Sequence, residues 1–195
     1  AGLTFIGPSV EMLELFGNKA LARAAATAAG VPIIRGLDHA VSVVEAQAFF
    51  DTLEDGRGMM IKAVGGGGGR GSRAVENASD VAATFDRCRA EALAAFGNGD
   101  LFVEEFIGQA RHVEVQILGD TSGGVTHLGE RECSVQRYFQ KIIEVAPAPG
   151  LPNDIRREII GAAVRFAGEV GYSNAGTFEF LVDVSGNSGS MPFAF

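Results

Sequence analysis

The sequence predicts an α+β fold, because helical and strand-like segments are interspersed without a regular order. Some segments repeat apolar residues at helical spacing, whereas others are short and apolar or alternate between apolar and polar residues. They do not follow the strand–helix–strand order of a doubly wound sheet. The length of 195 residues suggests one domain or one and a half. The composition, 47% hydrophobic and 21% charged, is typical of a globular protein with a real core.

Four helices are predicted from apolar periodicity. The first covers residues 11–29, with a break near Gly17 and Asn18, and ends at Gly30 with Pro32 close behind. Further helical periodicity covers 43–53 and 81–96. The clearest helix covers 154–170, with Asn153 as N-cap. Its apolar stripe consists of Ile155, Ile159, Ala163, Phe166 and Val170.

Strands are predicted where short apolar or alternating runs occur. These runs cover residues 59–64, 101–107, 112–118, 124–129 and 177–182. The segment HVEVQIL, residues 112–118, is close to a strict alternation and predicts a sheet with one face in water. The chain stops on a further apolar strand, MPFAF.

A run of glycines carries the strongest chemical signal. The strand MIKAV, with Lys62 at its centre, leads into GGGGGRG. Glycines let backbone amides approach an anion closely, and a lysine on the preceding strand can place a charge on a phosphate. A flexible linker is the alternative, but such linkers seldom follow an apolar strand with one lysine. The pattern favours a mobile loop that covers phosphates.

Two other nucleotide motifs do not fit this segment. A Walker A loop needs Lys and then Ser or Thr after its last glycine, and only Ser72 follows here. A dinucleotide-binding fingerprint opens a helix, whereas residues 72–75 are typical of a returning strand. We therefore predict a hairpin of two strands joined by the glycine turn.

Charge and cysteine usage exclude several classes of function. The net charge is −8 and no basic cluster exists, which argues against nucleic acid as a partner. No apolar stretch is long enough to cross a membrane, and no signal segment is recognisable. Cys88 and Cys133 have no metal-ligand spacing, which favours a reducing, cytoplasmic setting.

Six blocks, in order, resemble the biotin carboxylases of the ATP-grasp superfamily. They are FIGPS, GNK, IKAVGGGGGRG, RHVEVQIL, GERECSVQRYFQKIIEVAPAPG and AGTFEFL, and they extend over the whole chain. The resemblance implies an ATP-grasp fold with a helical linker at 1–33, a lid subdomain at 34–106 and a partial C-terminal subdomain with an antiparallel sheet at 107–195. A related ligase such as a carbamoyl-phosphate synthase is an alternative, but the five-glycine lid favours biotin carboxylase.

The resemblance also implies which residues bind the phosphates and the metal. Lys19 and Lys62 would reach the nucleotide phosphates. Glu179 would hold Mg²⁺ (or Mn²⁺), since a hard cation takes oxygen ligands, and Lys141 would be the catalytic lysine near bicarbonate. The phosphates would be covered by the lid glycines Gly66, Gly67, Gly68 and Gly69.

The nucleoside would be bound on two sides. The resemblance places Glu104, with the backbone of Glu105 and Ile107, at the adenine ring. It places His112 and Gln136 at the ribose. From the residues alone, an ordinary solvated or structural role is the default for six of these side chains: Lys19, Glu104, His112, Gln136, Lys141 and Glu179. Gln136 and Lys141 lie in what reads as a polar loop.

The sequence departs from the family pattern in two ways. Phe139 stands where many members have histidine, so the polar contact of that side chain is lost. The second magnesium carboxylate, the bicarbonate-binding residues and the general base of the family all lie outside this sequence, so we expect the fragment alone to be inactive. The parent enzyme would use ATP, bicarbonate and biotin on a carrier domain, work with a carboxyltransferase, and form homo-oligomers. A nucleotide-binding module without catalysis is the remaining alternative.

Overall fold

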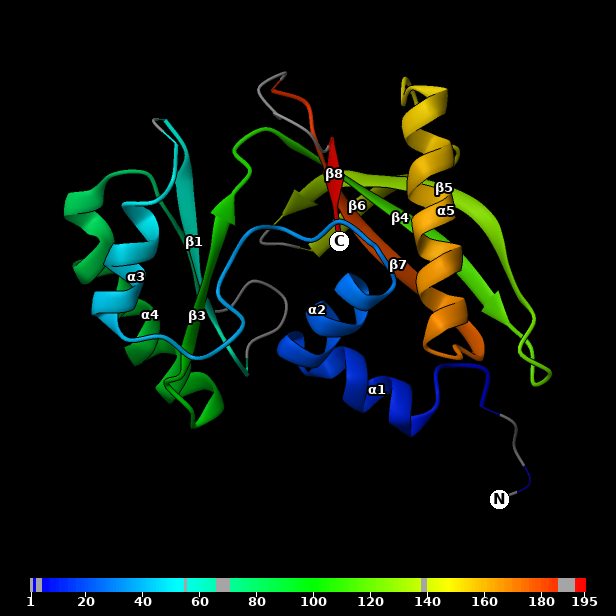
Figure 1. Ribbon diagram of the computed structural model, residues 1–195, viewed down its shortest axis with the longest axis horizontal. Coiled ribbons are helices and arrows are strands. Elements are labelled where there is room, and N and C mark those ends of the chain that lie inside the picture. The colour runs from blue at the N-terminus through cyan, green and yellow to red at the C-terminus, as the bar shows by residue number, and fades with distance from the viewer. Residues whose placement is uncertain (1, 3–4, 55, 66–70, 138–139, 186–191) are drawn as a thin grey trace. The chain divides into compact units, whose positions relative to one another are not determined.

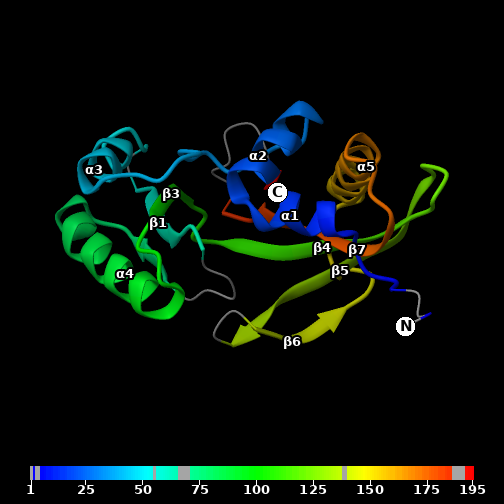
Figure 2. The same ribbon diagram turned by 90° about the horizontal axis from the view of Figure 1, so that it is seen from below.

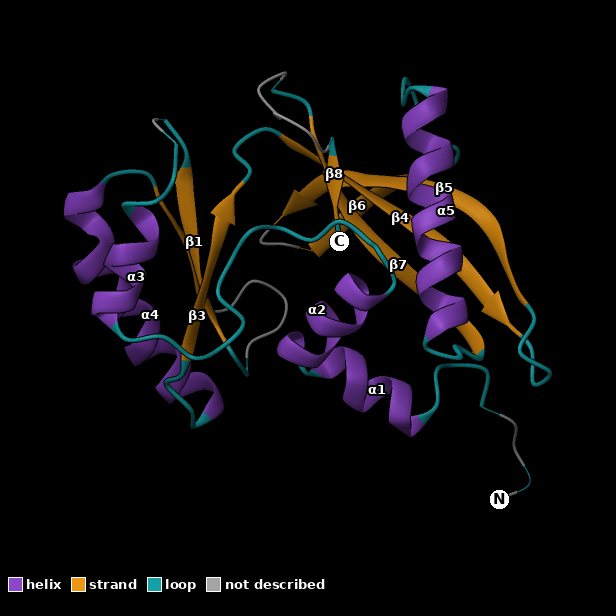
Figure 3. Cartoon of the chain, in the orientation of Figure 1, coloured by secondary structure: helices purple, strands orange, loops and turns teal. Residues whose placement is uncertain are grey.

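The computed structural model describes residues 2, 5–54, 56–65, 71–137, 140–185 and 192–195. The chain divides into two compact units, each of which is described by itself. One unit comprises residues 1–33, 109–136 and 141–195, and the other comprises residues 34–108 and 137–140. Two antiparallel sheets and their helices agree with the predicted α+β class (Figure 3).

The smaller unit is a three-stranded sheet with two helices on one face (Figure 1). Its elements are α3 (Val43–Phe50), β1 (Gly58–Ala63), β2 (Ser72–Val75), a 3₁₀ turn (Ala78–Asp80), α4 (Val81–Phe96) and β3 (Leu101–Phe106). The strand order is β2-β1-β3. Ser42 begins α3 through a capping box with Glu45, and Gly97 ends α4 in the left-handed conformation, with φ of 70°. The predicted hairpin around the glycines is therefore confirmed as the pair β1 and β2.

The larger unit is a five-stranded sheet with helices packed against it. Its elements are α1 (Val10–Gly17), α2 (Lys19–Ala28), β4 (Ala110–Gly119), β5 (Val125–Arg137), β6 (Gln140–Val145), α5 (Asn153–Glu169), β7 (Asn174–Asp183) and β8 (Phe193–Ala194). The strand order is β6-β5-β4-β7-β8. In Figure 2, α5 lies on one side of β4 and β7, and β6 lies on the other.

The core of each unit follows from the alternation of its strands. In the larger unit, Val113, Val115 and Ile117 of β4 are fully buried in one cluster with Ile159 and Phe166 of α5. In the smaller unit, every second residue of β1 and β3 is buried with the helices: Met59, Ile61, Ala63, Leu101 and Val103. The opposite face of the larger sheet carries polar side chains of β4, whereas that of the smaller sheet mixes Lys62 and Glu104 with the apolar Met60 and Phe102.

The helix break predicted near Gly17 and Asn18 is confirmed. The Asn18 side chain accepts hydrogen bonds from the amides of Ala20 and Leu21, so it caps α2 directly where α1 ends. The helix at 81–96 has the predicted bounds, and the predicted stripe of α5 packs into the core.

Two local predictions are wrong. Asn153 is the first residue of α5 and Pro152 is the N-cap; the Asn153 side chain accepts a hydrogen bond from Arg156 instead. The segment around Gln136 and Lys141 is no polar loop, because β5 continues to Arg137 and β6 begins at Gln140. The sequence of β6 shows no clear alternation of apolar and polar residues. Ile142 and Ile143 are both exposed, so burial does not impose a two-residue period.

Candidate functional site

The predicted site residues fall in both units. Lys62 lies on β1, Glu104 and Glu105 lie on β3, and Ile107 follows β3. Lys19, half-buried, is the first residue of α2. The remaining four are brought together in the larger unit: His112 on β4, Gln136 on β5, Lys141 on β6 and Glu179 on β7. Gly66, Gly67, Gly68, Gly69 and Phe139 lie outside the described residues.

A row of charged residues crosses three strands of the larger unit. In the register of the sheet, Glu114 of β4 is opposite Arg131 of β5 on one side and Glu179 of β7 on the other. Residues paired directly across antiparallel strands have Cβ atoms within reach of one another. The Nε atom of Arg131 donates to Oε1 of Glu114 at 2.7 Å. The row lies on the face opposite the valines of β4, so it is the polar face that alternation predicts.

Lys141 joins the two carboxylates of this row. Its ammonium donates to Oε2 of Glu114 and, at 2.5 Å, to Oε1 of Glu179. Glu114 is 2% exposed, whereas the Glu179 side chain is half exposed. The sequence predicted that this sheet face is exposed to solvent. Ion pairs instead bury it at Glu114, whereas it remains accessible to solvent at Glu179. An ionised, accessible carboxylate beside an ammonium is an arrangement that suits phosphate and metal chemistry.

His112 and Gln136 form the other arm of the cluster. The amide nitrogen of Gln136 lies 2.5 Å from Nδ1 of His112, and it donates at 2.8 Å to the carbonyl of Cys133. An amide N–H₂ group can only donate, so Nδ1 accepts and Nε2 carries the proton of the neutral ring. Nε2 lies 3.3 Å from Oε2 of Glu179. The histidine therefore presents a donor to the same carboxylate that Lys141 contacts.

These contacts shift each pKa in the direction that favours the charged form of the group. The hydrogen bond from His112 lowers the pKa of Glu179 to about 2, against some burial and with further help from Lys141. Burial alone would raise the pKa of Glu114, but hydrogen bonds from Lys141 and Arg131 outweigh it and lower the pKa. Burial opposes the charge of Lys141, yet its two carboxylate partners raise the pKa of the ammonium well above its usual range. All three groups are charged at neutral pH.

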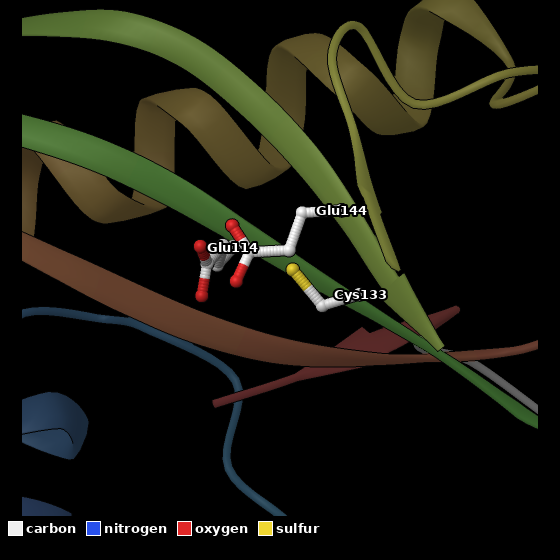
Figure 4. A group of neighbouring side chains, drawn as sticks. All are labelled: Glu114, Cys133 and Glu144. Atoms are coloured by element: carbon white, nitrogen blue, oxygen red, sulfur yellow. The ribbon is translucent and has the colours of Figure 1, made fainter. Parts of the chain in front are cut away.

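Glu114, Cys133 and Glu144 are grouped like metal ligands, but their surroundings do not suit a metal. Their ligand atoms lie within 4.8 Å of one another (Figure 4). Nε of Arg131 already lies 2.7 Å from Glu114 and 3.3 Å from Glu144. Burial raises the pKa of Cys133 to about 11, so the sulfur keeps its proton at neutral pH. We assign this group to an arginine-centred ion cluster and not to a metal site.

In the smaller unit, the side chains of Lys62 and Glu104 form an ion pair. Both belong to the sheet face opposite the helices, because Ile61 and Val103 point into the core. Glu105 is engaged differently: its amide donates to the carbonyl of Arg35 at 2.7 Å. The amide of Glu105, whose backbone the family resemblance places at adenine, is thus already hydrogen-bonded to the segment before α3.

Sequence reasoning missed Glu114 and Arg131, which organise the cluster. A signal for Glu114 was present, because it is a carboxylate in the same alternating strand as His112 and on the same face. Arg131 shows its role only through the register of β4 and β5, which the sequence does not reveal. Among helices of the described residues, none has the length and apolar character that crossing a membrane requires.

Two antiparallel sheets, one with Lys62 on a strand that precedes the glycine-rich sequence and one with a charged row, match the ATP-grasp architecture of biotin carboxylase domains. The family described as carbamoyl-phosphate synthase L chain, ATP binding domain, matches residues 18–191. The chain belongs to this family of ATP-binding domains.

Solved structures narrow the similarity to biotin carboxylase domains. The chain is 41% identical to a biotin carboxylase in complex with β,γ-ATP from Campylobacter jejuni, with a TM-score of 0.89 over 99% of this chain and 42% of that one. It is 42% identical to the biotin carboxylase domain dimer of 2-oxoglutarate carboxylase from Hydrogenobacter thermophilus, in complex with MgADP, ADP and bicarbonate. That TM-score is 0.86, over 95% of this chain and 41% of that one. These similarities confirm the resemblance drawn from the six sequence blocks.

Curated relatives include pyruvate carboxylases. The chain is 48% identical over 187 residues to pyruvate carboxylase 1 of Caenorhabditis elegans, covering 96% of this chain and 16% of the relative. It is 50% identical over 187 residues to mitochondrial pyruvate carboxylase of Homo sapiens, covering 95% and 16%. The chain thus spans about a sixth of the length of these relatives.

Proposed function

We propose that this chain is the nucleotide-binding core of a biotin carboxylase, which uses MgATP and bicarbonate to carboxylate biotin. The observation that carries the proposal is the cluster of the larger unit, where Lys141 and His112 both contact the half-exposed carboxylate of Glu179. The similar domain from Hydrogenobacter thermophilus binds MgADP and bicarbonate. A cluster of this kind can hold both ligands beside each other.

Phosphoryl transfer needs positioned cations more than covalent chemistry. A bicarbonate oxygen attacks the γ-phosphorus of ATP, ADP leaves, and carboxyphosphate forms. Carboxyphosphate breaks down to CO₂ and phosphate. A ureido nitrogen of biotin gives its proton to the released phosphate and takes up the CO₂. We assign to Lys141 the neutralisation of the oxygens that gain charge in the first step, because its pKa keeps it protonated throughout.

The donor set fits a magnesium ion at Glu179. Its carboxylate is ionised and half exposed, and oxygen ligands suit this cation. When bound, Mg²⁺ would withdraw charge from the nucleotide phosphates. Lys141 would turn part of its hydrogen bonding from Glu179 to substrate, while Glu114 keeps its ammonium in place.

The nucleoside contacts are part of the same proposal. His112 and Gln136 are adjacent on β4 and β5, and we propose that they meet the ribose. On the smaller unit, we propose that Lys62 meets the phosphates and that the backbone amide of Ile107 reads the adenine edge. Lys19 would add a second cation for the phosphates.

Partners and location complete the proposal. We propose that the parent protein works with a biotin carrier domain and a carboxyltransferase, and that it forms homo-oligomers, as the similar domain dimer does. Both cysteines are free and buried, which suits a reducing compartment such as the cytoplasm.

Titration calorimetry with MgATP tests the proposal directly. The wild-type chain should bind MgATP, and Lys62→Ala should weaken binding about tenfold or more, since a hydrogen bond to a charged group is lost. Arg87→Ala, which removes an exposed cation of α4, is the matched control and should bind like the wild type. A folded wild-type chain that binds no MgATP would refute the proposal.

A further inference from the structure

We propose that Arg131 is a positioning residue for the reaction: it fixes the carboxylate of Glu114, which in turn holds the ammonium of Lys141 ready for the ligand. This inference rests on the proposed function, which assigns to Lys141 the phosphate oxygens that gain charge. Arg131 and Lys141 contact the same carboxylate through different oxygens.

The guanidinium of Arg131 takes one oxygen of Glu114 and leaves the other for the lysine. Its Nε atom donates to Oε1 at 2.7 Å, and its Nη2 atom also contacts Oε1. The ammonium of Lys141 donates to Oε2. A carboxylate oxygen that is held by two nitrogens of a rigid, planar group resists rotation of the carboxylate. The direction of Oε2, and with it the place of the ammonium, is therefore set by Arg131.

Neighbouring strands hold the guanidinium itself. Arg131 lies on β5, between β4 and β6 in the strand order. Its Nη1 atom donates at 3.1 Å to Oε1 of Gln116 on β4, whose amide nitrogen donates at 2.8 Å to the carbonyl of Gly176 on β7. On the other side, Nε lies 3.3 Å from Oε2 of Glu144 on β6, a carboxylate that is close to Glu114 in Figure 4. The arginine is thus tied to both neighbouring strands and, through Gln116, to β7.

Arg131 is not placed to bind a ligand itself. Each of its three side-chain nitrogens has an acceptor within the protein, and the carboxylate of Glu114 is 2% exposed. If the guanidinium moved to a phosphate, this buried carboxylate would lose a cation, which is strongly unfavourable. Lys141 differs, because its second partner, Glu179, is half exposed and can be exchanged for a ligand. The arginine therefore acts through Glu114, and the lysine meets the ligand.

Holding the lysine in advance should strengthen binding of the ligand. A lysine side chain loses conformational freedom when it is fixed, and fixing it before the ligand arrives removes that part of the cost from binding. The geometry of the guanidinium matters here as well as its charge. Arg131→Lys keeps the charge but supplies one ammonium in place of a planar group with several fixed N–H donors. This variant therefore separates positioning from charge.

The motion of the Lys141 ammonium gives a test that needs no ligand. The chain contains three lysines, Lys19, Lys62 and Lys141, so single substitutions assign their Nζ signals in NMR spectra. Nitrogen relaxation gives the order parameter of each ammonium, which measures how far its direction is fixed. In both Arg131→Met and Arg131→Lys, the order parameter of Lys141 should fall from that of a rigid group to that of a flexible one, below about 0.6. Those of Lys19 and Lys62 should not change.

Binding of MgATP, measured by calorimetry, connects this motion to the proposed function. Arg131→Met should weaken MgATP binding about five- to tenfold, as expected when a charge-assisted contact of the lysine is no longer held in place. In the Lys141→Met background, the same change should alter MgATP binding less than about twofold, because Arg131 acts through the lysine.

Arg111→Met is the matched control. Arg111 also joins β4 to β5 through a glutamate, Glu132, but by alternation it lies on the face of β4 that carries the buried Val113. Its loss should leave the order parameter of Lys141 and the affinity for MgATP unchanged. If Arg131→Met does not fold, because Glu114 is left with one cation, Arg131→Lys takes its place in the same comparisons.

Three results would overturn the inference. One is an order parameter of Lys141 that stays at the wild-type value in folded Arg131→Met or in Arg131→Lys, since the geometry of the guanidinium then does not hold the lysine. Another is an equal fall in Arg111→Met, which would mean a general loosening of the sheet. A third is a weakening of MgATP binding that persists in full without Lys141. If the wild type binds no MgATP, the proposed function fails, whereas the order parameters still decide whether Arg131 holds Lys141.

Discussion

The ammonium Nζ of Lys141 lies 2.5 Å from Oε1 of Glu179, and it also donates to the buried carboxylate of Glu114. One partner is half exposed and the other is 2% exposed. The lysine is thus held by the buried Glu114. It can exchange its contact with the exposed Glu179 for a ligand, because Glu114 still compensates part of its charge.

Removing this ammonium should destabilise the larger unit. Lys141→Met leaves the buried Glu114 with Arg131 as its remaining cation, and we expect the free energy of unfolding to fall by about 1–3 kcal/mol. Chemical denaturation measures it. Glu179→Gln in the Lys141→Met background should restore part of the loss by removing one uncompensated charge. Arg157→Met, an exposed cation of α5, should have little effect.

Glu179 should make stability depend on pH in the acid range. Its pKa in the folded chain is about 2, below the ordinary 4.5, so the ionised form favours the folded state. This contribution is complete above pH 5 and is lost as the pH falls through 4.5 towards 2. Across that window, wild type should therefore lose more stability than Glu179→Gln. Glu158→Gln, exposed on α5, should behave like wild type; equal slopes for all three proteins would contradict the shift.

His112 should be the main cause of that low pKa. Its Nε2 lies 3.3 Å from Glu179, and this hydrogen bond is the largest influence on the carboxylate. His112→Phe should therefore raise the pKa of Glu179 towards 4.5, more than Lys141→Met does. Carboxyl carbon NMR titration of the three proteins gives the values directly. An unchanged midpoint in His112→Phe would show that Lys141 alone controls the carboxylate.

Much of the fold could be predicted from the sequence, because burying one face of a helix or strand places apolar residues at a regular spacing. The helix at 81–96 and the strand at 72–75 have the predicted bounds. Their buried apolar residues share one core: Val81, Phe85, Cys88 and Ala92 of the helix and Val75 of the strand. The pattern fails where burial is weak. In β6, Ile142 and Ile143 are both exposed, so no alternation distinguishes this strand from a loop.

The site is less predictable, because it depends on cross-strand register. His112 and Glu179 were found only through their sequence blocks; their contact arises because β4 and β7 are adjacent and in register. The ion pair between Lys62 and Glu104 also depends on register, because the two residues are 42 positions apart in the sequence and meet through the pairing of β1 and β3. Sequence patterns identify the faces of strands but not which faces are joined.

A separate ion pair with a buried carboxylate holds the segment between β6 and α5, and it should contribute to stability. Glu130 is 4% exposed and accepts from the amide of Ala148 at 3.1 Å and from Nε of Arg156 at 2.8 Å. Nη2 of Arg156 donates in turn to the Ala148 carbonyl at 2.9 Å. Glu130→Ala leaves Nε of Arg156 and the amide of Ala148 without their acceptor, which should cost about 2–4 kcal/mol of folding free energy.

Denaturation of Glu130→Ala, Arg156→Ala and the double variant checks this expectation. Because the two residues act on one segment, the double variant should lose less than the sum of the single losses. Arg157→Ala, the neighbouring exposed arginine of α5, should stay within about 0.5 kcal/mol of wild type. Strictly additive losses would mean that Glu130 and Arg156 stabilise the chain independently, and that their contact contributes nothing beyond the separate hydrogen bonds to Ala148.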